Sequence, residues 1–169
     1  VVEKQAVGGN ATFSFTSTVP GHAAFDLTTV GGAASATFNN VAPGSYALAE
    51  QPEAGWSSGT PVCSNGDAPG ALTIDAGETV TCTFTNTQYG TLVVEKQAVG
   101  GNATFSFTST VPGHAAFDLT TVGGAASTTF NNVAPGSYAL AEQPEAGWSS
   151  GTPVCSNGDA PGALTIGAG

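Results

Sequence analysis

An internal repeat constrains this chain more than any other feature of its sequence. Residues 1–77 recur 92 positions later as residues 93–169, with two differences, Ala36 against Thr128 and Asp75 against Gly167. Repeats of about 20–45 residues stack as solenoids because none of them buries a core alone, whereas a unit of about 100 residues can fold independently. The sequence therefore predicts separate domains in series.

We predict a first domain over residues 1–89 and a second over residues 90–169. The second copy stops before the counterpart of residues 78–88, so it lacks its last predicted strand. A sheet without that strand has an open edge, and we expect the second domain to be unstable unless the edge is filled. We expect the missing strand to follow in a longer array; donation by a neighbouring chain is the alternative.

The charge balance excludes several classes of partner. The chain has two lysines, no arginine and twelve acidic residues, which gives a formal net charge of −10. Such a surface repels phosphate backbones and anionic lipids, so we predict no nucleic-acid partner. No run of about 20 apolar residues is present, so we predict no membrane span here, and no motif indicates a cofactor or a metal site.

Short alternating runs rich in threonine, valine and phenylalanine predict strands and no helix. Glycine, proline and asparagine clusters separate them and supply the turns. The fold class that this pattern predicts is all-β, an Ig-like sandwich of two sheets in each repeat. The expected strands of the first repeat are 1–7, 12–17, 23–30, 34–39, 45–51, 60–64, 71–75 and 79–87.

Three polar residues fall on predicted core faces. Side chains alternate faces along a strand, so Asn86 lies in register with apolar neighbours in 79–87, as Lys4 does in 1–7 and Glu50 does in 45–51. The second copy repeats Lys4 and Glu50 as Lys96 and Glu142. An unpaired buried charge costs several kcal/mol, so we expect these side chains to meet.

The segments VVEK, SYALAEQPEAGW and VTCTFTNT, spread over the whole repeat, resemble the Cna-type B domains of Gram-positive surface proteins and pilins. These are also called SpaA-like or prealbumin-like domains. The resemblance implies a spontaneous isopeptide bond between Lys4 and Asn86, assisted by Glu50, with Lys96 and Glu142 as the partial set of the second repeat. The alternative is a buried ion pair with Asn86 as a hydrogen-bond partner. Asp26 is the alternative to Glu50 as the assisting acid, but Phe25 and Leu27 occupy the inward face of its strand, so Asp26 faces outward.

The cysteines also follow the repeat. Cys155 is the counterpart of Cys63, and the counterpart of Cys82 would lie beyond Gly169, so each complete repeat has a pair. A disulfide between Cys63 and Cys82 would close a loop of about 20 residues, stabilising the fold by roughly 3 kcal/mol. We predict this disulfide over two buried thiols, and with it an extracellular, cell-surface or secreted location.

We predict a structural role in an extracellular fibre, stalk, pilus-like filament or adhesin shaft, not that of an enzyme with turnover. The expected partners are adjacent identical repeats or subunits. The alternative function is a glycan- or surface-binding module repeated for avidity. Among the remaining aromatic residues, we interpret Trp56 as a core or rim residue and His22 as solvated.

Overall fold

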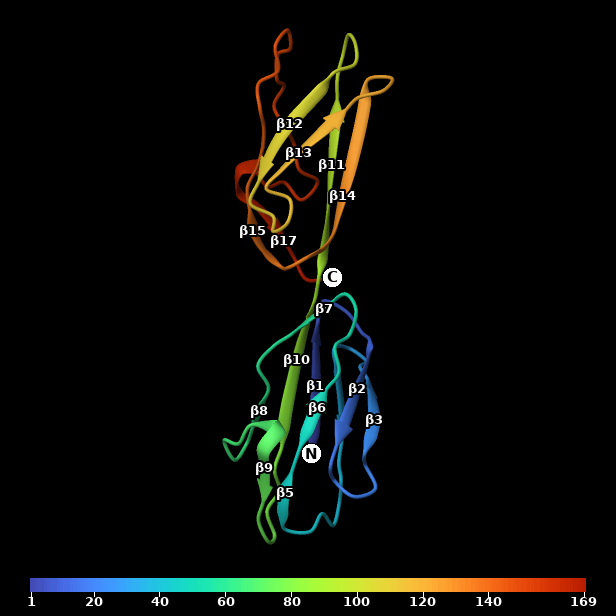
Figure 1. The fold of residues 1–169 in the computed structure, drawn as a ribbon, viewed down its shortest axis with the longest axis vertical. Coiled ribbons are helices and arrows are strands. Elements are labelled where there is room, and N and C mark those ends of the chain that lie inside the picture. The colour runs from blue at the N-terminus through green and yellow to red at the C-terminus, as the bar shows by residue number, and fades with distance from the viewer. The chain divides into compact units, whose positions relative to one another are not determined.

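The computed structural model describes residues 1–169 as two compact units (Figure 1). The first unit contains Val1–Gln88 and Ala168–Gly169, and the second contains Tyr89–Gly167. Strands make up almost all of the regular structure, and the only helices are two single 3-10 turns, η1 (Pro69–Ala71) and η2 (Pro161–Ala163). Neither turn is long enough to cross a membrane.

The first sheet of unit 1 joins the two ends of the repeat. Its strands are β4 (Ala33–Ala36), β1 (Val2–Val7), β10 (Cys82–Gln88) and β7 (Trp56–Ser58) in that order, and β8 (Val62–Cys63) also pairs with β10. β1 and β10 are parallel and run side by side in Figure 1. The first and last strands of the unit are therefore hydrogen-bonded neighbours.

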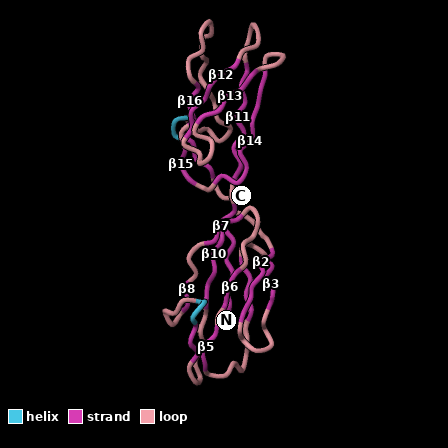
Figure 2. The backbone as a smooth tube through the Cα atoms, in the orientation of Figure 1, coloured by secondary structure: helices cyan, strands magenta, loops and turns pink.

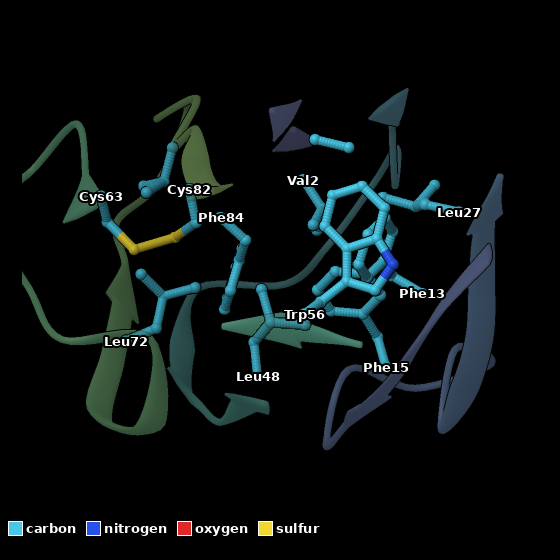
Figure 3. Packing of buried hydrophobic residues seen from close by; sticks show 12 residues of the cluster. Val2, Phe13, Phe15, Leu27, Leu48, Trp56, Cys63, Leu72, Cys82 and Phe84 are labelled. Carbon is cyan, nitrogen blue, oxygen red and sulfur yellow. A yellow bond between two sulfur atoms is a disulfide. The ribbon is translucent and has the colours of Figure 1, made fainter. Parts of the chain in front are cut away.

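A second layer covers the inner face of that sheet. It contains β3 (Ala24–Thr28), β2 (Thr12–Ser17) and β6 (Leu48–Glu50) in that order, while β5 (Gly44–Tyr46) pairs with β9 (Leu72–Ile74). The buried side chains of the two layers form one core, seen from close by in Figure 3. The predicted all-β sandwich is confirmed.

Several predicted strand boundaries are wrong. The run 45–51 is two strands, because the backbone of Ala47 leaves the ladder and bonds to Thr18 through both its N–H and its carbonyl. The halves on either side pair with different partners, β9 and β2. The run 60–64 shrinks to β8, and β7 was not predicted at all. The runs 23–30 and 34–39 are shorter than predicted.

Unit 2 repeats this plan without counterparts of β7, β8 and β10 (Figure 2). Its strands are β11 (Gly90–Gln97), β12 (Thr104–Ser109), β13 (Ala116–Thr120), β14 (Ala125–Val133), β15 (Gly136–Tyr138), β16 (Leu140–Glu142) and β17 (Leu164–Ile166). β11 pairs only with β14, so one of its edges has no strand beside it. β14 is longer than β4 because Gly90 and Leu92 extend the ladder to Val133 and Phe130.

Candidate cross-link site

Lys4 points into the core of unit 1. It follows Val2 and precedes Ala6 on the buried face of β1, and only 1% of its surface is exposed. Its Nζ lies 2.8 Å from Glu50 Oε1 and donates a hydrogen bond of 3.4 Å to the carbonyl of Phe84. The amine also lies 4.1 Å from the centroid of the Phe13 ring. A lysine with one carboxylate, one carbonyl and one ring around it has no contact with water.

Burial changes the acidity of this lysine. Desolvation lowers the pKa of Lys4 below its ordinary value, and the neighbouring Glu50 carboxylate opposes the shift. Because its pKa is lowered, Lys4 needs less free energy to form the neutral amine than an exposed lysine does. A neutral amine has a free lone pair and is therefore a nucleophile.

Asn86 lies in the same core without any hydrogen-bond partner. Its side chain is fully buried, and both Oδ1 and Nδ2 are unpaired. Glu50 Oε1 lies 2.8 Å from the amine of Lys4 but also lacks a well-directed hydrogen bond. An unsatisfied buried amide costs about 1–3 kcal/mol, and such groups in a folded protein call for a specific explanation.

The strand register places Lys4 and Asn86 on the same face of the sheet. Lys4 is opposite Phe84 and Ala6 is opposite Asn86, so Lys4 and Asn86 are diagonal neighbours on the inner face of the sheet. Diagonal neighbours are within reach of long side chains. Glu50 arrives from the other layer, where β6 pairs with β2. An amine, a carboxyl and a carboxamide therefore share one dry region of the core.

The second unit holds only part of this set. Lys96 Nζ donates to Glu142 Oε1 at 2.6 Å and lies 4.1 Å from the Phe105 ring centroid, as in the first unit. The side chains are more open, however, with exposed fractions of 13% for the lysine and 24% for the glutamate. No residue of the second copy corresponds to Asn86, so unit 2 offers the lysine no amide.

The predicted disulfide is confirmed. Cys63 and Cys82 are bonded across the antiparallel pair of β8 and β10, and both are buried (Figure 3). Cys155 is a free thiol.

Other side chains singled out in the sequence lie elsewhere. Asp26 is exposed on β3, so it is not beside the lysine. Trp56 is buried and meets the Phe13 ring edge to face, at 5.2 Å between centroids. His22, interpreted as solvated, is half-buried, and its ring stacks on Phe38 with 3.9 Å between the ring centroids. That contact joins residues from separate segments, and no local pattern signals it.

The sequence analysis did not identify Phe13 as part of the site. Its place on the buried face of β2 was visible from alternation, but its contact with the lysine depends on how the two layers face each other. No group of three or more histidine, cysteine, aspartate or glutamate residues is placed to hold a metal ion.

Comparison with known proteins agrees with this architecture. A search of curated protein sequences gives no significant match. Among solved structures, the chain is similar to the major pilin protein from Streptococcus pyogenes, with 15% sequence identity, 88% of this chain and 82% of that chain covered, and a TM-score of 0.35. The family model described as the prealbumin-like fold domain matches residues 1–88 and again residues 92–169. Both repeats match over nearly their full length, and the chain belongs to the SpaA-type family of prealbumin-like fold domains.

Proposed function

We propose that the chain is part of an extracellular structural fibre, such as a pilus-like filament, a stalk or an adhesin shaft. In this proposal each complete repeat locks itself with an isopeptide bond, which in unit 1 joins Lys4 to Asn86. The observation that supports it best is the buried carboxamide of Asn86, which has no hydrogen-bond partner in the same core region as a desolvated lysine. The adjacent Glu50 supplies the proton transfers.

The reaction needs no cofactor. A proton moves from the Lys4 ammonium to the Glu50 carboxylate, which leaves a neutral amine and a neutral acid in an apolar core. Nζ attacks Cγ of Asn86 while the Glu50 hydroxyl donates to Oδ1 and stabilises the developing charge. Glu50 then carries a proton from Nζ to Nδ2. The Cγ–Nδ2 bond breaks, ammonia leaves, and Nζ–Cγ becomes an amide.

This chemistry occurs once per domain and has no turnover. Its value is mechanical, because β1 and β10 are the first and last strands of the unit and lie in parallel. Pulling the two ends of the unit apart would shear this ladder along its length. A covalent bond between the same two strands would carry the load and leave the rest of the unit unstretched.

The disulfide supports an exported location, since such bonds persist in oxidising compartments. The repeated unit supports partners of the same kind, either adjacent repeats or further subunits.

Intact mass of the full chain tests the proposal. After reduction of the disulfide, we expect the chain to weigh one ammonia less than its sequence, because only unit 1 has a complete set. Glu50→Gln and Asn86→Ala should each restore the missing mass. Glu3→Gln, an exposed acid on the outer face of β1, is the matched control and should keep the loss.

Trypsin gives an independent readout because the chain has only two basic residues. Trypsin cuts after a free lysine and does not cut after an acylated one. The denatured wild-type chain should be cut after Lys96 alone, whereas Glu50→Gln should also be cut after Lys4. A wild-type chain with its full mass and both cuts would overturn the proposed cross-link.

A further inference from the structure

The register between β1 and β10 is not set by a turn. The two strands are parallel, and about 80 residues of chain lie between the partners Lys4 and Phe84. Antiparallel strands joined by a hairpin inherit their register from the turn, and this pair has no such connection. Another feature of the unit must therefore select which residue of β10 lies beside Lys4.

Burial alone does not select it. A slip by one residue would expose the apolar face of β10, but a slip by two residues keeps every side chain on its own face. The outer face of this segment is a ladder of half-buried threonines, Thr81, Thr83, Thr85 and Thr87, which looks the same after a two-residue slip. On the inner face the same slip would put Phe84 or Gln88 in the place of Asn86.

The disulfide limits this ambiguity from the edge of β10 away from β1, where it ties β10 to β8. Cys82 lies directly opposite Cys63 in the ladder between β10 and β8, with 4.0 Å between their Cα atoms. A two-residue slip moves a strand by about 7 Å, which a bonded pair of cysteines cannot follow. The bond lies about 13 Å along β10 from Asn86, four residues away, so it does not touch the reacting atoms.

We propose that the Cys63–Cys82 disulfide is a positioning pair for the cross-link, fixing the register of β10 so that the Asn86 amide meets Lys4. This inference rests on the proposed function. Under this proposal the thiols are oxidised first, and the resulting disulfide accelerates formation of the cross-link. A misplacement of about 1 Å can slow a reaction ~100-fold, so a slip of a whole register is prohibitive.

The two covalent steps balance separately. The thiols of Cys63 and Cys82 lose two electrons and two protons to a disulfide oxidant such as glutathione disulfide, which becomes two thiols. The cross-link then exchanges the Asn86 amide nitrogen for the lysine nitrogen and releases ammonia without any change of oxidation state.

The experiment follows ammonia loss over time by intact mass, in the full chain made by cell-free synthesis and quenched in acid. One reaction contains a glutathione redox buffer and the other contains dithiothreitol. We expect the reduced chain, and the variant Cys63→Ser/Cys82→Ser in either buffer, to lose ammonia about tenfold more slowly or worse. Equal rates in the two buffers would overturn the inference.

Two further variants separate positioning from stability. Leu27→Ala truncates a buried residue of β3, away from β10, and keeps the disulfide. At a temperature where its folded fraction matches that of the double serine variant, it should react at the wild-type rate. If it is as slow as the serine variant, stability alone explains the effect and the inference fails.

The second variant moves the bond without changing the register. Val62 and Thr83 are the neighbouring partners in the same ladder, on the outer face. Adding Val62→Cys and Thr83→Cys to the double serine variant should restore the rate once thiol labelling shows that the new bond has formed. A bonded but slow chain would contradict the register argument. A wild-type chain that never loses ammonia would instead refute the cross-link itself.

Discussion

The variant Glu50→Gln should weaken unit 1 through two separate losses. The first is the cross-link, which would close a loop of about 80 residues; the chain-entropy model values such a closure at about 4–5 kcal/mol. The second is the loss of the carboxylate that pairs with the buried Lys4. Glutamine keeps the shape of the side chain but leaves the Lys4 ammonium uncompensated, and removing one partner of a buried ion pair costs about 3–5 kcal/mol.

Deprotonation of the lysine limits the second loss. From the ordinary value of 10.5, giving up the proton at pH 7 costs about 5 kcal/mol. The two losses together are comparable with the 5–15 kcal/mol that stabilises a typical domain, so we expect unit 1 to be marginal or unfolded at neutral pH. Adding Lys4→Met should recover most of the second loss and none of the first.

The pH dependence has a definite sign. Burial holds the pKa of Lys4 in the folded state below its unfolded value, so the unfolded state binds more protons between the two values. The stability of Glu50→Gln should therefore rise with pH, by up to about 1.4 kcal/mol per unit, from the lowered pKa towards 10.5. The double variant with Lys4→Met should show no such rise.

Urea unfolding followed by tryptophan fluorescence measures these effects, in a Trp148→Phe background so that Trp56 alone reports on unit 1. Glu3→Gln makes the same change of charge on the surface and should stay within about 0.5 kcal/mol of wild type. A Glu50→Gln chain that unfolds at the wild-type urea concentration and still loses ammonia would refute the assignment of Glu50.

Three further predictions follow from the geometry. The rate of ammonia loss should fall at alkaline pH with a midpoint below 10.5. Above the lowered pKa of Lys4, the Lys4–Glu50 pair loses the proton that the reaction needs on Glu50. A rate that keeps rising with pH would point to a free amine that reacts without an acid partner. In denaturant without reductant, one thiol per chain should react with maleimide, and peptide mapping should locate it at Cys155. Gly32→Ala should destabilise unit 1 by more than about 1 kcal/mol in the same urea titration, since φ is +83° and the added Cβ would meet the Ala6 carbonyl oxygen at 2.9 Å. The control Gly31→Ala should cost less, because Gly31, at φ +63°, has open space around it.

Alternation predicted the buried face of β10 correctly because threonine occupies every second position from Thr79 to Thr87, with Val80, Cys82 and Phe84 between them. The same rule placed Lys4 between two buried neighbours. It failed at Ala47, where the alternating pattern continues while the backbone turns to bond with Thr18. A pattern of period two reports which face a side chain occupies, and it carries no information on which strands are neighbours.

Long-range contacts account for the rest. The parallel pairing of β1 with β10 joins residues about 80 positions apart, and the ring of Phe13 reaches the amine of Lys4 from the opposite layer. The missing hydrogen bonds of Asn86 are likewise a property of the packed core. The sequence could suggest that an asparagine is buried, whereas only the fold reveals that it has no partner.

The disulfide lies inside the segment that the cross-link would close, and this arrangement predicts how far unit 1 extends under force. The disulfide closes 19 residues within the segment that the cross-link would close, so stretching should release different lengths from different variants. With the cross-link formed, tension passes from Lys4 directly to Asn86 and no unfolding step should appear for unit 1. In Glu50→Gln the whole unit should extend by about 30 nm when reduced, at up to about 3.6 Å per residue, and by about 7 nm less when the disulfide is intact. Optical tweezers attached to the two ends of the chain resolve both lengths. An unfolding step of unit 1 in the oxidised wild-type chain, about 7 nm shorter than the full extension, would mean that no covalent bond joins the first strand to the last.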